Sequence, residues 1–330
     1  MNNLWGIGLA LAVAGPSWFL GKALPLVGGP VFGILLGILI ALQPRPARFE
    51  AGLKFTTKKI LQAAIILLGF EMNLSSVFAV GGESLLVMAF TLTAAFLTAW
   101  GVSRALSLTG KTPVLIGVGT AICGGSAIAA TAPVIGADDD EVARSISTIF
   151  LFNVLAVFIF PPIGHALGLS DTGFGLWAGT AVNDTSSVVA TGLAYSDAAL
   201  KYATIVKLTR TLLIIPIVMI LAVYTARKSA VSGTESHGKP VNIVKIFPWF
   251  VIGFLAASVL RTTGLVNESV AHFLATAGKF LIVMAMASIG LNTKLGKLIA
   301  SGWKPIALGL SCWAAVAVTS LFAQFLSGRW

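Results

Sequence analysis

Two stretches of the chain decide its architecture: GTAICGGSAIAAT at residues 119–131 and GTAVNDTSSVVAT at residues 179–191. Shifted by 60 positions, they match at six of thirteen residues. Each holds a short polar or glycine-rich break inside an otherwise apolar segment, Cys123–Ser126 in the first and Asn183–Ser187 in the second. Interrupted apolar segments at corresponding positions of a membrane protein indicate a binding site near the bilayer midplane.

The composition around these stretches is that of a membrane protein. Of the 330 residues, 57% are hydrophobic and 10% are charged, and the mean hydropathy is +0.94. Soluble domains carry about 25% charged residues, so a soluble protein is excluded. A spanning helix needs about 20 apolar residues. We therefore expect an all-α polytopic membrane protein with about nine to eleven transmembrane helices.

The distribution of basic residues predicts the orientation. The net charge is +10, from 22 basic and 12 acidic side chains. The basic residues concentrate in the connections 43–59, 104–111, 227–245 and 292–304. Because basic loops face the cytoplasm, we expect a cytoplasmic N-terminus and an external C-terminus. The stretch Gln43–Lys59 is interpreted as lying along the cytoplasmic interface. No nucleic-acid partner is expected.

The chain also contains a longer repeat. A shift of 221 positions matches Leu61–Trp100 to Ile282–Leu321 and aligns Lys58 with Lys279. In the predicted topology the two copies run in opposite directions, which is the inverted repeat of many transporters. The broken segments should share this symmetry and meet at the midplane. The sequence leaves open whether each is a re-entrant hairpin or an unwound spanning helix.

The longest polar connection suggests a division of the chain. We interpret residues 229–245 as a linker. Residues 1–228 then form a first part of the membrane domain, which includes both broken segments (112–136 and 173–195). Residues 246–330 form a second part that repeats 58–103.

The two breaks supply the candidate site. A helix-compatible run follows each break, so two helix N-termini should face a central cavity, where free backbone N–H groups and the positive dipole end favour an anion. The alternative is a pair of Gly/Ser kinks that serve close packing. The predicted substrate-binding residues are Cys123, Gly124, Gly125, Ser126, Asn183, Thr185, Ser186, Lys207 and Arg210.

Three charges inside apolar segments complete this hypothesis. Lys207 and Arg210 are spaced i, i+3 on one helix face, and intramembrane charges need partners. A bound anion or Asp184 could provide them; the alternatives are snorkelling or a fixed ion pair with Asp184. Asp184 is the predicted ion-coupling residue, unless it is a permanent partner of these cations. Asn153 is a candidate for the same cavity, with packing as its alternative role.

The same motifs carry a family resemblance. The runs GKTPVLIGVGTAICGGSAIAATAPVI (Gly110–Ile135), AVNDTSSVVATG (Ala181–Gly192) and VKLTRTLLIIPI (Val206–Ile217) resemble the YeiH-like sulfate exporter family from about residue 20 to the end. The resemblance implies a multi-pass protein of the bacterial inner membrane and a secondary anion exporter. It also implies kinship with inverted-repeat carriers such as bile-acid symporters and sodium/proton antiporters.

We therefore expect a secondary active transporter that exports a small anion, such as sulfate or another sulfur oxyanion or sulfonate, coupled to protons or sodium. The alternatives are a passive anion channel and a sodium/proton-type cation antiporter that uses Asp184. The expected partners are the anion, the coupling ion and the lipid bilayer, and a homodimer is a further hypothesis. No enzymatic activity is expected, because the sequence offers no convincing pair of nucleophile and base. No cofactor is expected, and no metal site is expected because the spacing of the histidines does not suggest one.

Overall fold

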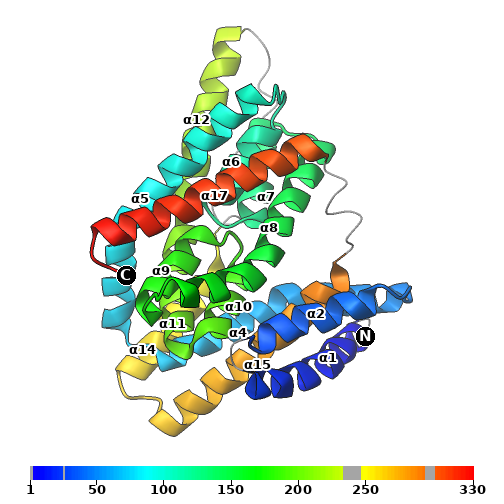
Figure 1. Ribbon diagram of the computed structural model, residues 1–330, viewed down its shortest axis with the longest axis vertical. Helices are drawn as coiled ribbons and strands as arrows, with labels where there is room; N and C mark the ends of the chain where they lie inside the picture. The colour runs from blue at the N-terminus through cyan, green and yellow to red at the C-terminus, as the bar shows by residue number, and fades with distance from the viewer. Residues whose placement is uncertain (1–2, 25–26, 233–246, 294–301) are drawn as a thin grey trace.

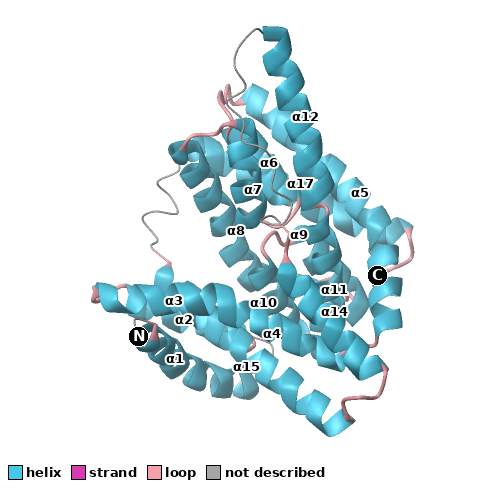
Figure 2. Ribbon diagram, turned by 180° about the vertical axis from the view of Figure 1, so that it is seen from behind, coloured by secondary structure: helices cyan, strands magenta, loops and turns pink. Residues whose placement is uncertain are grey.

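The computed structural model describes residues 3–24, 27–232, 247–293 and 302–330, and these are helical without any strand (Figures 1 and 2). Six helices are long and apolar enough to cross a membrane, and four shorter apolar helices accompany them. The expected all-α polytopic membrane fold is confirmed. Most of the predicted linker 229–245 lies outside the described residues.

The described helices form two bundles (Figure 1). The first bundle contains α1 (Leu4–Ala23), α2 (Gly29–Ala41), α3 (Glu50–Phe55), α4 (Leu61–Leu68), α14 (Trp249–Thr262) and α15 (Glu268–Asn292), with the short turns η1 (Ala47–Phe49), η2 (Thr56–Ile60) and η3 (Gly69–Glu71). The second bundle contains α5 (Leu74–Ala105), α6 (Thr112–Ala121), α7 (Gly125–Ile135), α8 (Asp139–Ala166), α9 (Asp171–Ala181), α10 (Thr185–Tyr195), α11 (Asp197–Leu212), α12 (Ile214–Ser232) and α17 (Trp303–Leu326).

Each bundle combines helices from both sides of residues 233–246. Within the described residues the bundles meet mainly where α10 lies against α2 and α15, with a smaller contact between α14 and α5. The repeat predicted by the 221-residue shift corresponds to α4–α5 and to the end of α15 followed by α17. The copies of its second half, α5 and α17, pack against each other.

Close helix contacts in the first bundle depend on glycine. A Cβ atom on Gly37 would lie 2.5 Å from the Ala287 carbonyl oxygen, and one on Gly33 would lie 3.0 Å from that of Val283. Small residues let backbones approach where the surrounding solvent is lipid. The sequence motif Gly33-x-x-x-Gly37 therefore joins α2 to α15.

Each broken segment is a re-entrant hairpin. At the base of the first hairpin (α6–α7), Lys111 Nζ just before α6 donates to the Gly136 carbonyl just after α7. At the base of the second hairpin (α9–α10), Ser196 Oγ after α10 donates to the Asp171 carboxylate at the start of α9 over 2.7 Å. Because the two ends of each segment lie side by side, the alternative of an unwound spanning helix is excluded.

The two hairpins enter from opposite sides. Their bases adjoin opposite ends of α8, a helix of 28 residues and therefore about 42 Å long. Glu141, in the first turn of α8, accepts from Lys111 N–H over 2.6 Å. Tyr195 Oη, at the end of α10, donates over 2.6 Å to the Leu169 carbonyl just beyond α8. Asp138 caps α8 through a capping box with Glu141, as is favourable for acidic groups at a helix start.

Cysteine labelling in intact membranes tests this topology. We expect Asp139→Cys and Thr172→Cys to react with membrane-impermeant maleimide from opposite faces, because they lie at opposite ends of α8 and both are exposed. The native chain is the control, since Cys123 and Cys312 are buried. Reaction of both variants from the same face would contradict the opposed hairpins.

Candidate functional site

The tips of the two hairpins meet beside the middle of α8. A Cβ atom on Gly124, in the first tip, would lie 3.6 Å from the Asp184 Cβ in the second. Asn153 of α8 supports the second tip, because its Oδ1 accepts from the N–H groups of Asn183 (3.2 Å) and Asp184 (3.0 Å). Gly124 has φ +69° and ψ −129°, a conformation that is essentially restricted to glycine. The glycine at this position is therefore required by the turn between α6 and α7.

The carbonyl ends of α6 and α9 are bound by α11. Lys207 Nζ donates to the Ile122 carbonyl over 2.7 Å and to the Val182 carbonyl over 3.1 Å, so it joins both tips. Arg210 Nε donates to the Ala121 carbonyl over 2.7 Å, and its two terminal nitrogens donate to the Thr120 and Thr180 carbonyls.

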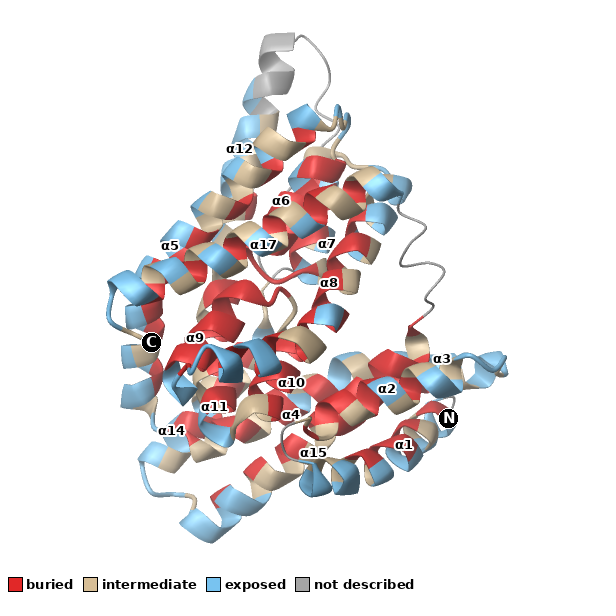
Figure 3. Ribbon diagram, in the orientation of Figure 1, coloured by how far each residue is buried: buried red, intermediate tan, exposed pale blue. Residues whose placement is uncertain are grey.

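These contacts explain how two cations can be fully buried on one helix face. Lys207 and Arg210 are both 0% exposed, and α6 and α9 are almost wholly buried (Figure 3). The last carbonyls of a helix have no intrahelical partner and carry the negative end of its dipole. The positive charges of Lys207 and Arg210 therefore compensate the negative dipole ends of α6 and α9, in addition to any longer-range interaction with Asp184.

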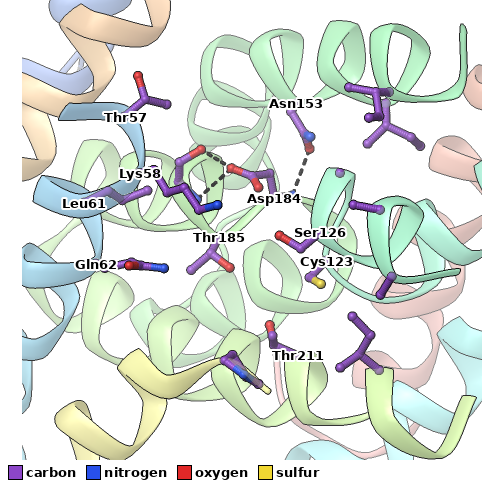
Figure 4. Close-up of a pocket in the computed structure, with 18 of the residues that line it drawn as sticks. Thr57, Lys58, Leu61, Gln62, Cys123, Ser126, Asn153, Asp184, Thr185 and Thr211 are labelled. Carbon is purple, nitrogen blue, oxygen red and sulfur yellow. Dashed lines mark hydrogen bonds between the residues drawn. The ribbon is translucent and has the colours of Figure 1, made fainter. Parts of the chain in front are cut away.

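The N-terminal ends of α7 and α10 border a cavity of about 850 Å³ between the bundles, here called the tip cavity (Figure 4). Its walls are mostly apolar and aromatic. Its described lining residues include Leu61, Ile65, Ile149, Phe150, Phe247, Phe250 and Ile289. It extends toward the base of the first hairpin, where Pro133 and Ile146 line it. Volume and lining both fall in the range of small-molecule sites.

Several polar groups in the tip cavity have no partner among the described residues. They are the Ser126 and Thr185 hydroxyls, the Gln62 amide, Asn153 Nδ2, Lys58 Nζ and Asp184 Oδ1. Asn153 is only 3% exposed, and it lines the cavity, so its Nδ2 is a donor that the cavity can use. Ser126 and Lys58 are exposed, and Gln62, Asp184 and Thr185 are partly exposed, so their polar groups are accessible from the cavity. A few convergent polar groups in a mostly apolar cavity indicate a site for a polar ligand.

Two charged groups of opposite sign line the described wall of this cavity. Asp184 caps α10, and its Oδ2 accepts from the Ser186 N–H over 3.0 Å and from the Ser186 hydroxyl. Lys58 belongs to η2, a π-helical turn between α3 and α4, and in Figure 4 its side chain reaches toward the wall that carries Asp184 and Thr185. Single π-helical turns are frequent at functional sites.

The structure divides the predicted site residues into two groups. The lining of the tip cavity contains Cys123, Gly125, Ser126, Asp184, Thr185 and Ser186. Gly124, Asn183, Lys207 and Arg210 lie behind it and form or hold the tips. The Asn183 side chain is buried, and its amide makes no hydrogen bond with a described residue.

Sequence reasoning missed Lys58 and Gln62. Lys58 lies inside the stretch Gln43–Lys59 interpreted as interfacial, and Gln62 follows that stretch. The structure instead continues α3 through η2 into α4 and brings Lys58 to the cavity wall. The alignment of Lys58 with Lys279 in the 221-residue repeat was the one available signal. Within the described residues, no group of three or more His, Cys, Asp or Glu is placed to hold a metal ion.

An ion-pair network joins the bundles near the base of the second hairpin, whereas the tip cavity extends toward the base of the first. Glu71 of η3 lies 3.3 Å from Lys201, 3.8 Å from Lys279 and 3.6 Å from His272. Lys279 also pairs with Asp197 over 2.8 Å. Asp197 and Lys201 belong to α11 of the second bundle, and the other three residues belong to the first. We call these five residues the closing network.

Comparison with known proteins identifies the family. The family described as "Conserved hypothetical protein 698" matches residues 5–309. The chain belongs to the UPF0324 family of membrane proteins. It is 50% identical over 338 residues to a UPF0324 membrane protein of Streptococcus pyogenes serotype M18, covering 100% of this chain and 99% of the relative. It is 47% identical over 348 residues to one of Fusobacterium nucleatum, covering 99% of both.

The resemblance to the YeiH-like family is therefore confirmed across nearly the whole chain. No solved structure is significantly similar to this UPF0324 protein.

The role of Lys207 in this UPF0324 protein can be tested by stability. We expect Lys207→Met to lower the free energy of unfolding by about 3–5 kcal/mol, because it removes one partner of a buried charged interaction and leaves the Ile122 and Val182 carbonyls unpaired. Thermal unfolding in detergent measures the loss. Lys201→Met on the same helix is the matched control, with an expected change of at most about 1 kcal/mol.

A native unfolding midpoint for Lys207→Met, combined with lost ligand binding, would contradict the structural role and make Lys207 a direct substrate ligand.

Proposed function

We propose that this protein is a secondary active transporter that exports a small anion across the bacterial inner membrane. We define the mouth of the tip cavity as its end near Pro133 and Ile146, at the base of the first hairpin. In this proposal the N-terminus and this mouth face the cytoplasm, in accord with the basic connections 43–59 and 104–111. The observation that carries the proposal is the meeting of two opposed hairpins at a cavity, with the N-termini of α7 and α10 beside it.

The chemistry of the cavity supports an anion. Free N–H groups and the positive dipole ends of two half-helices favour negative charge. The Ser126 and Thr185 hydroxyls add neutral donors, and Lys58 adds a cation. Cys123, Gly125 and Ser186 complete this part of the wall. Gly124 and Asn183 would shape the tips, while Lys207 and Arg210 would act on the anion through the tips that they hold.

The asymmetry between the two hairpin bases supports a carrier over a passive channel. The tip cavity extends toward the base of the first hairpin, and the closing network joins the bundles near the base of the second. Alternating access needs one side closed at a time, through movement of one bundle against the other. A channel would need a continuous path.

Asp184 is the proposed coupling residue. Its Oδ2 is used within the second tip, while Oδ1 is free to bind a proton or a sodium ion. The second candidate function is a sodium/proton-type cation antiporter, which the same free carboxylate oxygen favours. The two functions differ in whether an anion is carried.

Counterflow in proteoliposomes tests the proposed function. We expect saturable uptake of radiolabelled sulfate or sulfonate into vesicles loaded with the unlabelled anion, because a carrier exchanges its substrate. Gly124→Ala should lower this exchange at least tenfold, since alanine is strained at φ +69°. Gly8→Ala in α1 is the matched control, because a Cβ atom there meets no neighbour.

An uptake rate that does not saturate with anion concentration, and that is the same with and without unlabelled anion inside the vesicles, would favour the channel. Absence of exchange with every anion, in folded protein, would favour cation transport through Asp184.

The closing network gives a second test of alternating access. We expect Ser126→Cys to react with an impermeant reagent from the cavity mouth and only slowly from the opposite side. Adding Glu71→Gln and Lys279→Met should raise the opposite-side rate about fivefold, which corresponds to about 1 kcal/mol from a partly exposed ion-pair network.

The matched control is Glu83→Gln, because Glu83 pairs with Arg329 inside the second bundle at 3.8 Å. Equal labelling from both sides without the network substitutions would contradict a carrier closed on one side.

A further inference from the structure

The tip cavity holds one group of each charge among its described lining residues, Lys58 and Asp184. A simple inorganic anion would gain from Lys58 and from the two helix N-termini but would be repelled by Asp184. It would also offer no carbon atoms to the apolar walls. A ligand that brings a cation would gain a charged hydrogen bond to the Asp184 carboxylate, which sulfate cannot make.

We propose that the tip cavity takes a small organic zwitterion, with an acidic group at one end and an ammonium group at the other. This inference rests on the proposed carrier and replaces its simple anion by a molecule whose acidic group binds where the anion would bind. Amino sulfonates and amino acids have this chemistry. Their carbon chains would contact apolar side chains such as Ile149 and Phe150.

The acidic group has a convergent set of donors. Ser126 and Thr185 lie in the first turns of α7 and α10, and their hydroxyls are unused within the described residues. Asn153 Nδ2 is free although the residue is 3% exposed. Lys58 supplies the positive charge. Charged hydrogen bonds of this type are stronger than neutral ones.

The ammonium group has one acceptor that fits. Asp184 Oδ2 is used by Ser186, but Oδ1 has no partner among the described residues. No other acidic residue lines the described part of the cavity. A coupling proton or sodium ion would compete with the substrate ammonium for this carboxylate. That competition by itself couples release of the substrate to binding of the ion.

Lys58 also ties binding to the conformational state. It is carried by η2 of the first bundle, whereas Ser126, Asn153 and Asp184 belong to the second. Movement of one bundle against the other changes the distance between the cation and the remaining donors. The acidic group is therefore held most tightly when the bundles adopt one relative position, which a carrier requires.

Ligand binding to the purified full-length protein tests the zwitterion. The probes are taurine, isethionate, in which a hydroxyl replaces the ammonium group, and ethanolamine, which lacks the sulfonate. Calorimetry should give taurine a Kd at least about tenfold lower than either analogue, because each analogue leaves one charged group unpaired.

Three variants separate the two ends of the site. Asp184→Asn should weaken taurine and leave isethionate unchanged or tighter, while asparagine still caps α10. Lys58→Gln should weaken taurine and isethionate by the same factor. Lys59→Gln is the matched control, because this neighbouring lysine does not line the cavity and should change neither affinity.

Equal Kd values for taurine and isethionate would overturn the zwitterion proposal. An Asp184→Asn variant that weakens the affinity for both ligands by the same factor would also overturn it. Binding and counterflow of sulfate without taurine would overturn it while leaving the anion carrier intact. Lack of counterflow with sulfate, isethionate and taurine alike would instead reject the proposed function.

Discussion

The site depends on the burial of two cations against the carbonyl ends of two half-helices. A hairpin that stops in the middle of a membrane leaves unpaired carbonyls where no water can reach them, and each would cost several kcal/mol. Lys207 and Arg210 bind five such carbonyls from residues 120–122, 180 and 182. The cations need these acceptors as much as the tips need the donors, because an isolated charge at that depth is also unfavourable. This mutual dependence fixes both tips to α11.

The carbonyls at the C-terminal ends of α6 and α9 are hydrogen-bonded to Lys207 and Arg210. The N-terminal ends of α7 and α10, on the other side of each break, therefore remain available for a ligand. Asp184, Ser126 and Thr185 lie where α7 and α10 begin, and their unused groups face the cavity rather than the protein interior. The first bundle closes the other wall and contributes Lys58. The charged residues that hold the hairpin tips, Lys207 and Arg210, are therefore different from the candidate ligand-binding charges, Lys58 and Asp184. This separation is useful in a carrier, because the ligand groups can change with each conformational state while the tips remain intact.

Much of this arrangement follows from sequence patterns that repeat. The match between residues 119–131 and 179–191, at a shift of 60 positions, predicted paired breaks. The hairpin form needed the structure, because only the Lys111–Gly136 and Ser196–Asp171 contacts show that the ends adjoin. The partners of Lys207 could not be predicted from the sequence either. They are main-chain carbonyls, which every type of residue has. Lys58 was hidden in a basic stretch whose composition is typical of a membrane interface.

A cryo-EM structure determined with saturating taurine would test the central claim most directly. The account predicts ligand density in the tip cavity between Lys58 and Asp184, with Lys207 and Arg210 still bound to the carbonyl ends of α6 and α9. Density that instead contacts Lys207 or Arg210, with these side chains released from the carbonyls, would contradict it. In that case the buried cations would be the substrate ligands and the hairpin tips would be held by some other interaction.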